Sequence, residues 1–192
     1  MRPTFVLFSG LPGTGKTALA DMLARDLKWP LLRIDDLAAC MPAAIDRNTT
    51  EFWDLAIAAL LHIAEVQLKM TINVIADSIF MNLDRMHAAA IARECDARLV
   101  PVYMFISDEM IWKERVTARF LESILGDDAA SWTQVMEQQK RFRPWEPGTA
   151  LFVDGVRPLE ENFQTVRTCV CDPKREFSPM AEVAFIPGKY HN

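Results

Sequence analysis

The sequence predicts an α/β protein in which a doubly wound parallel sheet lies between two layers of helices. Short apolar segments of strand length alternate along the chain with longer segments of helical periodicity, and this alternation is typical of parallel strands joined by helical crossovers. The first apolar segment also leads through a glycine-rich loop directly into a helical segment. With 192 residues, the chain is long enough for one well-buried domain and leaves little for a second.

Five apolar segments are expected to form the strands, namely residues 4–9, 31–34, 72–76, 99–106 and 151–153. Helical patterns separate them, and the expected helices cover residues 17–27, about 50–70 with Thr50 as a possible cap, 83–95, from 108 onward, and 131–142 with Ser131 as the cap. Residues 172–192 contain three prolines and little periodicity, which predicts an irregular tail after a main domain of residues 1–171.

A phosphate-binding loop follows the first expected strand. The pattern Gly-x4-Gly-Lys-Thr, which wraps the phosphates of a nucleoside triphosphate, is matched by Gly10, Leu11, Pro12, Gly13, Thr14, Gly15, Lys16 and Thr17. Lys16 is expected to place its charge on the β- and γ-phosphates, and the Thr17 hydroxyl is expected to bind Mg²⁺. The helix that continues through Ala18 presents its N-terminus to the same phosphates. ATP and Mg²⁺ are therefore the expected cofactors.

Composition excludes several classes of protein. Hydrophobic residues make up 51% and charged residues 24% of the chain, as in ordinary soluble proteins, and no apolar run is long enough to span a bilayer. The apolar N-terminal segment enters the phosphate-binding loop at once, so it is expected to be a core strand and not a secretion signal. We therefore expect a cytoplasmic protein without a membrane partner.

Charge and cysteine content narrow the expected partners further. The net charge is −5 and no run of Lys or Arg forms a basic stripe, so a nucleic-acid partner is not expected. The four cysteines fit no zinc spacing and are expected to be free thiols. Cys169 and Cys171 are expected to lie on one face of a strand.

Two acidic positions follow expected strands, where α/β nucleotide enzymes place their reactive groups. Asp35 and Asp36 come directly after the second strand, and we predict that Asp35 accepts the proton of an attacking hydroxyl while Asp36 lies against the acceptor. The alternative is a helix N-cap, a role that Asp36 could fill beside a catalytic Asp35. Asp77 ends the third strand and is predicted to hold Mg²⁺ or to bind the acceptor, the alternative being a turn-forming aspartate.

Several cationic and aromatic residues are further candidates. Arg115 and Arg119 lie four residues apart and therefore on one helical face, where they could neutralise the charge of the transferring phosphoryl group, or instead pair with Glu114 or Glu122. The weaker candidates are Arg85 for orienting the acceptor, Arg157 for packing against adenine, and Phe52 and Trp53 for contacting an apolar or ring-containing acceptor.

These residues resemble the adenylate-kinase-like branch of P-loop kinases from Thr4 to about Val170. The chain is similar to chloramphenicol phosphotransferase, zeta toxin, the kinase domain of polynucleotide kinase, and gluconate and shikimate kinases, whose uncharacterised relatives are often labelled AAA-family ATPases. The matching segments are the phosphate-binding loop, Ile34-Asp35-Asp36-Leu37 with Met41-Pro42, Asp77-Ser78-Ile79-Phe80, and Glu114-Arg115-Val116-Thr117-Ala118-Arg119.

The resemblance implies a five-stranded parallel sheet of order 2-3-1-4-5, a helical lid at about residues 108–145 that carries the arginines, and Asp35 as the base. It departs from some relatives at Asp77-Ser78, where they carry paired carboxylates. The expected function is ATP-dependent phosphorylation of a small-molecule hydroxyl by a monomer or homodimer. The alternatives are a polynucleotide 5′-hydroxyl kinase and, from another class, a nucleotide-dependent regulatory ATPase.

Overall fold

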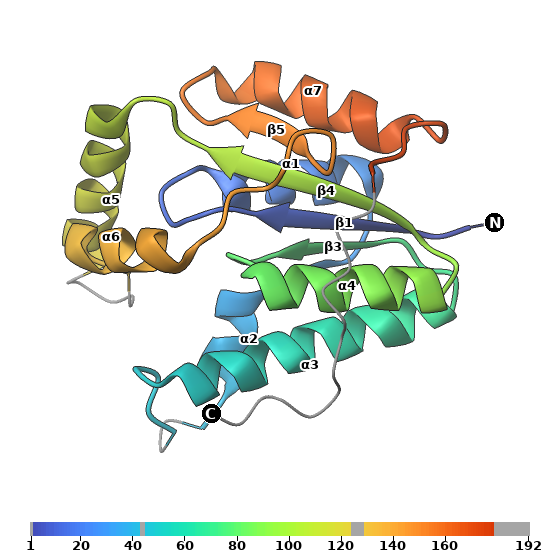
Figure 1. The fold of residues 1–192 in the computed structure, drawn as a ribbon, viewed down its shortest axis with the longest axis horizontal. Helices are drawn as coiled ribbons and strands as arrows, with labels where there is room; N and C mark the ends of the chain where they lie inside the picture. Colours follow the sequence, from blue (N-terminus) through green and yellow to red (C-terminus); the bar gives the residue numbers. More distant parts are fainter. Residues whose placement is uncertain (1, 43–44, 124–128, 179–192) are drawn as a thin grey trace.

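A computed structural model of the protein describes residues 2–42, 45–123 and 129–178 (Figure 1). Five parallel strands form one sheet in the order β2-β3-β1-β4-β5, which confirms the predicted topology. The strands are β1 (Thr4–Ser9), β2 (Leu31–Arg33), β3 (Val74–Asp77), β4 (Arg98–Phe105) and β5 (Leu151–Asp154).

Helices cover both faces of the sheet, which gives the three predicted layers (Figure 1). The helices are α1 (Lys16–Leu27), α2 (Ile34–Cys40), α3 (Thr50–Lys69), α4 (Asn82–Glu94), α5 (Glu109–Ser123), α6 (Trp132–Arg141) and α7 (Leu159–Cys171). One apolar core joins α1 and α7 to the sheet, and a second joins α3 and α4 to the opposite face. Helices α5 and α6 lie together beyond one end of the sheet, beside the loop that leaves β1.

The central strand β1 sets the position of the site. All six of its residues are buried, and it pairs with β3 on one side and β4 on the other. Phe8 lies opposite Asp77 in this register. Because the strands are parallel, the carboxyl ends of β1 and β3 meet at one edge, and the phosphate-binding loop begins beside Asp77.

Several element boundaries differ by one or two residues from those expected, and three of these differences have a clear structural description. Ile72 precedes β3 because Thr71 takes a left-handed conformation with φ 60° and the strand begins only at Val74. Ile34 is the first residue of α2 and not the last of β2. Thr49, and not Thr50, caps α3, because its hydroxyl accepts the Phe52 N–H. By contrast, Ser131 caps α6 as predicted.

The prediction that Cys169 and Cys171 lie on a strand is wrong, since both belong to α7. The buried residues of this helix recur at spacings of three and four, which is helical periodicity, and they are Asn162, Phe163, Val166, Cys169 and Val170. Two cysteines separated by one residue occur in strands and in helices, so this spacing alone could not distinguish a strand from a helix. The four cysteines are free.

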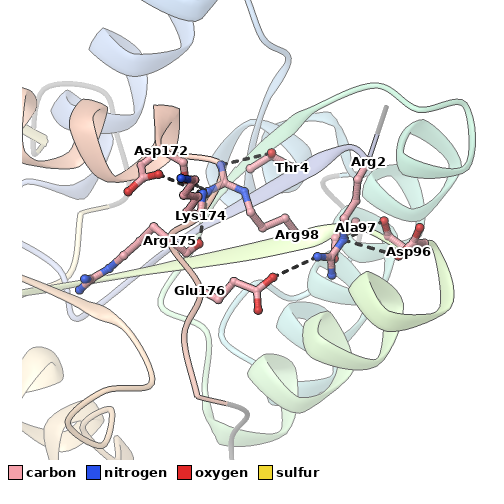
Figure 2. A network of polar contacts seen from close by, with 9 residues as sticks. All are labelled: Arg2, Thr4, Asp96, Ala97, Arg98, Asp172, Lys174, Arg175 and Glu176. Atoms are coloured by element: carbon pink, nitrogen blue, oxygen red, sulfur yellow. Dashed lines mark hydrogen bonds and ion pairs between the residues drawn. The ribbon is translucent and has the colours of Figure 1, made fainter.

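The segment after α7 is held to the start of β1 and β4 by two arginines (Figure 2). Arg98 is buried and donates to the carbonyls of Val170 and Asp172, the latter at 2.6 Å, so its charge lies at the C-terminus of α7. Arg2 joins Asp96 to Glu176 through ion pairs of 3.5 and 3.2 Å. Residues 172–178 thus have no helix or strand but are anchored, and the rest of the expected tail lies outside the described residues.

No helix in the described ranges is long and apolar enough to cross a membrane.

We predict that Arg98→Met lowers the free energy of unfolding by about 2 kcal/mol, because it leaves buried carbonyls at the end of α7 without a charged donor. Urea denaturation followed by circular dichroism measures this loss. The control is Arg167→Met, also at α7, which breaks an exposed ion pair with Asp26 of α1 and should change stability little. Equal losses in the two variants would contradict the capping role of Arg98.

Candidate active site

A cavity of about 210 Å³ lies at the phosphate-binding loop. It is lined by Gly13, Gly15, Lys16, Thr17, Ala18, Arg115 and Arg119. The structure therefore brings the predicted loop residues together with both predicted arginines, which come from α5 about a hundred residues further along the chain. Backbone N–H groups, a lysine and two guanidinium groups around one cavity form a site suited to several phosphates.

The loop is enclosed so closely that two glycines cannot be replaced without a shift of structure. A Cβ at Gly13, where φ is +80°, would lie 2.6 Å from the Val116 Cγ2 of α5. A Cβ at Gly155, just after β5, would lie 2.4 Å from the Thr14 carbonyl oxygen. Helix α5 and the turn after β5 therefore form two walls of the phosphate-binding loop.

Lys16 is buried and folds back onto its own loop. Its Nζ donates to the Leu11 carbonyl at 3.0 Å, and the Thr14 hydroxyl donates to the same oxygen at 2.8 Å. Burial lowers the pKa of Lys16, and the negative charges of Asp77 and Asp35 oppose this shift. Lys16 is thus held by a carbonyl of its own loop.

Thr17 and Asp77 form the polar pair expected of a magnesium site. The Thr17 hydroxyl donates to Asp77 Oδ2 at 2.8 Å. The second carboxylate oxygen, Oδ1, is buried and has no hydrogen-bond partner among the residues that the structure describes. Burial raises the pKa of Asp77, while the charge of Lys16 acts in the opposite direction. A hydroxyl beside an unsatisfied carboxylate oxygen fits Mg²⁺, which is usually held by few protein oxygens together with water and phosphate oxygens.

The described residues contain no group of three or more His, Cys, Asp and Glu side chains that could hold a metal ion by themselves. Thr17 and Asp77 would therefore hold Mg²⁺ together with the nucleotide and not in a protein cage.

The two aspartates after β2 have different surroundings. Both lie in the first turn of α2 and are exposed, and Arg33 is its N-cap, so the alternative in which Asp36 caps the helix is wrong. Because α2 begins at Ile34, Asp36 lies inside the helix and not at the position that precedes it. Asp36 accepts hydrogen bonds from Arg33 Nε at 2.8 Å and Nη2 at 3.0 Å. The negative charge of Asp35 instead opposes the lowering of the Lys16 pKa and adds to the raising of the Asp77 pKa.

The arginines of α5 face the loop. Arg115 Nη1 donates to the Gly155 carbonyl at 2.8 Å, and the charge of Arg119 acts on Lys16. Both arginines are exposed apart from these contacts, so their guanidinium groups remain accessible to a ligand in the cavity. Both arginines therefore line the cavity, and their phosphate-binding role stays a prediction.

Four weaker candidates lie elsewhere. Phe52 is 1% exposed in the core, and Trp53 points outward with its indole bonded to the Arg47 carbonyl at 2.9 Å. Arg157 lines a separate hollow of about 220 Å³ beside β5, and not the cavity at the loop.

Arg85, the fourth of these candidates, is 1% exposed and does not face the cavity. Its guanidinium donates to the carbonyls of Phe80 and Arg143, both at 2.7 Å, and lies over the rings of Phe142 and Trp145. It fastens the segment after α6 to the segment after β3. The expectation that it orients an acceptor therefore has no support in its surroundings.

Sequence reasoning missed the residues that hold α5 against the loop. Trp112 and Val116 are buried there with Leu11 in a third apolar cluster. The available signal was spacing, because positions 112, 115, 116 and 119 lie on one face of a helix. The packing of that face against the loop depends on tertiary structure, which spacing does not reveal.

The fold and the phosphate-binding loop together define a nucleotide-binding protein with the fold of adenylate-kinase-like P-loop kinases. A family model described as an AAA domain matches residues 5–145, and the chain belongs to that family. No curated protein is significantly similar in sequence.

Solved structures of low sequence identity share this fold. A protein from Chloroflexus aurantiacus, provisionally described as a kinase, is 23% identical with a TM-score of 0.69, and the alignment covers 88% of this chain and 98% of that one. A gluconokinase from Sinorhizobium meliloti is 16% identical with a TM-score of 0.64, covering 88% and 92%. The APS kinase CysC of Mycobacterium tuberculosis, in complex with AMPPNP and APS, is 18% identical with a TM-score of 0.63, covering 86% and 95%. The predicted resemblance is thus confirmed at the level of the fold.

We predict that Asp77→Asn weakens the binding of ADP in the presence of Mg²⁺ by about tenfold or more, because the amide keeps the shape and the Thr17 contact but removes the charge that attracts the ion. Isothermal titration calorimetry with Mg²⁺ and with EDTA measures both affinities. The EDTA value should change much less. A variant that retains the full effect of Mg²⁺ would contradict the metal role of Asp77.

Asp84 accepts the Met81 N–H at 2.8 Å at the start of α4. Burial, with a smaller contribution from the charge of Asp54, raises the pKa of this carboxyl to about 6. The folded state therefore binds its proton more tightly than the unfolded state does, and the protein loses stability as pH rises from about 4 to about 6.

We predict that Asp84→Asn, which keeps an acceptor for Met81, is more stable than the natural chain above pH 6 by about 2 kcal/mol, and equally stable near pH 4. Thermal unfolding at several pH values measures the difference. A constant difference at every pH would contradict the raised pKa.

Proposed function

We propose that the protein is an ATP-dependent phosphotransferase that moves the γ-phosphate to a hydroxyl group of a small molecule. The observation that carries this proposal is the joint arrangement around the cavity. Lys16, Thr17 and the two α5 arginines line it, and Asp77 accepts a hydrogen bond from Thr17. The charge of Asp35 acts on Lys16 and Asp77 from α2.

The proposed roles follow from the charge that develops during transfer. Lys16 exchanges the Leu11 carbonyl for phosphate oxygens, and Arg115 and Arg119 neutralise the γ-phosphoryl group. Mg²⁺, held beside Thr17 and Asp77, supplies further neutralisation when bound. Asp35 accepts the proton of the acceptor hydroxyl as the new oxygen–phosphorus bond forms, and the bond to the β-phosphate oxygen breaks to release ADP.

The class of acceptor is inferred from charge and from the neighbouring structures. The chain has a net charge of −5, which opposes binding of a polynucleotide backbone. Gluconokinase and an APS kinase bound to AMPPNP and APS share the fold, and these names favour ATP as donor and a small molecule as acceptor. We place the acceptor between α2 and the start of α3, on the side of the loop where Asp35 lies.

A nucleotide-dependent regulatory ATPase is the second candidate, because Kti12 of Chaetomium thermophilum in complex with ADP-AlF3 has the same fold with a TM-score of 0.64 and 18% identity, covering 86% of this chain and 98% of that one. The two candidates differ in their need for an acceptor. Transfer of labelled γ-phosphate should be screened against metabolites, antibiotics and 5′-hydroxyl oligonucleotides. ADP release that rises only with one acceptor supports a phosphotransferase, whereas equal hydrolysis without any acceptor contradicts it.

We predict that Asp35→Asn lowers kcat for transfer by a factor of about a hundred or more, because the amide cannot accept the hydroxyl proton, and leaves ADP affinity nearly unchanged. Labelled-phosphate transfer and calorimetry measure the two quantities with the acceptor found in the screen.

Asp36→Asn is the matched control for this variant, because it removes a neighbouring charge that is bound to Arg33 and is not directed at Lys16. Lys16→Ala, in contrast to Asp35→Asn, should weaken the binding of the nucleotide itself. An equal loss of kcat in the Asp35 and Asp36 variants would show that the lost charge on α2 is responsible, and would contradict the assignment of Asp35 as the base.

A further inference from the structure

We infer that Trp112 is a positioning residue that holds the arginines of α5 at the phosphate-binding loop. The inference rests on the proposed function. Its central observation is a hydrogen bond of 2.8 Å from the indole Nε1 of Trp112 to the carbonyl of Pro12, two residues that lie a hundred positions apart in the chain. Pro12 immediately precedes Gly13, which lines the cavity.

The helical geometry of α5 connects this bond to the arginines. Trp112, Arg115, Val116 and Arg119 occur at spacings of three and four, so their side chains leave the helix on one face. The apolar pair on that face contacts the loop, since a Cβ at Gly13 would lie 2.6 Å from Val116 and 3.3 Å from the Trp112 ring. The cationic pair lines the adjoining cavity. Helix α5 therefore links the contact of Trp112 and Val116 with the loop to the positions of the two arginines.

The surroundings of Trp112 fix its orientation. It is 7% exposed in the apolar cluster that includes Leu11, Val116, Val135 and Phe142, and its ring meets that of Trp132 edge-on with centroids 5.2 Å apart. Packing alone permits small rotations and translations of a helix, because apolar contacts have little directional preference. The indole bond adds a directional contact between α5 and the loop backbone.

The consequence is a selective effect on the transition state. ADP is bound mainly by the loop backbone and Lys16, whereas the charge on the transferring γ-phosphoryl group requires Arg115 and Arg119 in position. Loss of the indole N–H displaces the arginines relative to the loop but leaves the loop residues present. Aluminium fluoride bound together with ADP mimics the transferring phosphoryl group. Loss of the indole N–H should therefore lower the affinity for ADP with aluminium fluoride more than the affinity for ADP alone.

The test compares Trp112→Phe, which keeps an aromatic ring and removes the donor, with Trp132→Phe, which removes a tryptophan from the same cluster. Calorimetry of the full chain measures the affinity for Mg²⁺ and ADP with and without aluminium fluoride. In Trp112→Phe the affinity gained from aluminium fluoride should fall about five- to tenfold, in keeping with the loss of one hydrogen bond. ADP affinity should change less than about twofold, and Trp132→Phe should match the natural chain.

Equal loss of ADP and ADP–aluminium fluoride affinity in Trp112→Phe would indicate general loosening of the loop and overturn the inference, as would equal effects in the two variants. If the natural chain binds no ADP at all, the proposed function fails and the inference fails with it. The two failures are therefore distinguishable, since the first requires a natural chain that binds both ligands.

Nuclear magnetic resonance of ¹⁵N-tryptophan-labelled protein provides a readout that does not depend on the variant's stability. The chain has five tryptophans. The indole signal that is missing from the spectrum of Trp112→Phe is assigned to Trp112. The Trp112 indole N–H should exchange with deuterium more slowly than that of Trp132, and its signal should move when Mg²⁺ and ADP saturate the loop. An unmoved signal at saturation would overturn the inference.

Discussion

The structure depends on the close enclosure of one loop by elements that lie far from it in sequence. Residues 10–17 must direct their backbone N–H groups inward, and this conformation is held from outside by α5 and the turn after β5, whose atoms leave no room for a side chain at Gly13 or at Gly155. The sheet order follows from the same requirement, because β1 must be central to have β3 and Asp77 on one side and β4 on the other. The phosphate-binding loop is therefore a product of the whole domain.

This enclosure changes how the predicted lid is understood. Residues 108–145 were expected to carry arginines over the site, and α5 and α6 do lie at that end of the sheet (Figure 1). However, Leu11 of the loop is 6% exposed within the same apolar cluster as Trp112 and Val116. Movement of α5 away from the loop would expose this shared cluster to water, with a free-energy cost that grows with the apolar area exposed. The base of the lid is thus part of the core.

Features specified by local pattern were predictable from sequence, and features that depend on distant contacts were not. The five strands and the loop followed from apolar periodicity and a fixed motif, so they could be predicted before any tertiary contact was known. Arg85 was misjudged because its burial depends on Phe142 and Trp145, which only the folded chain brings to it. Cys169 and Cys171 were misjudged because their spacing of two is compatible with both a strand and a helix.

The charges of the site have a further consequence for stability. Lys16 and Asp77 are both buried, and Lys16 donates to a carbonyl of its own loop. Within the described part of the chain, one Asp77 oxygen has no hydrogen-bond partner. Burial of charges with incomplete partners lowers the stability of the ligand-free domain. Phosphates and Mg²⁺ would supply the missing partners to both residues at once, so binding and folding favour the same arrangement of the loop. Groups suited to phosphate chemistry are therefore incompletely satisfied by the protein alone.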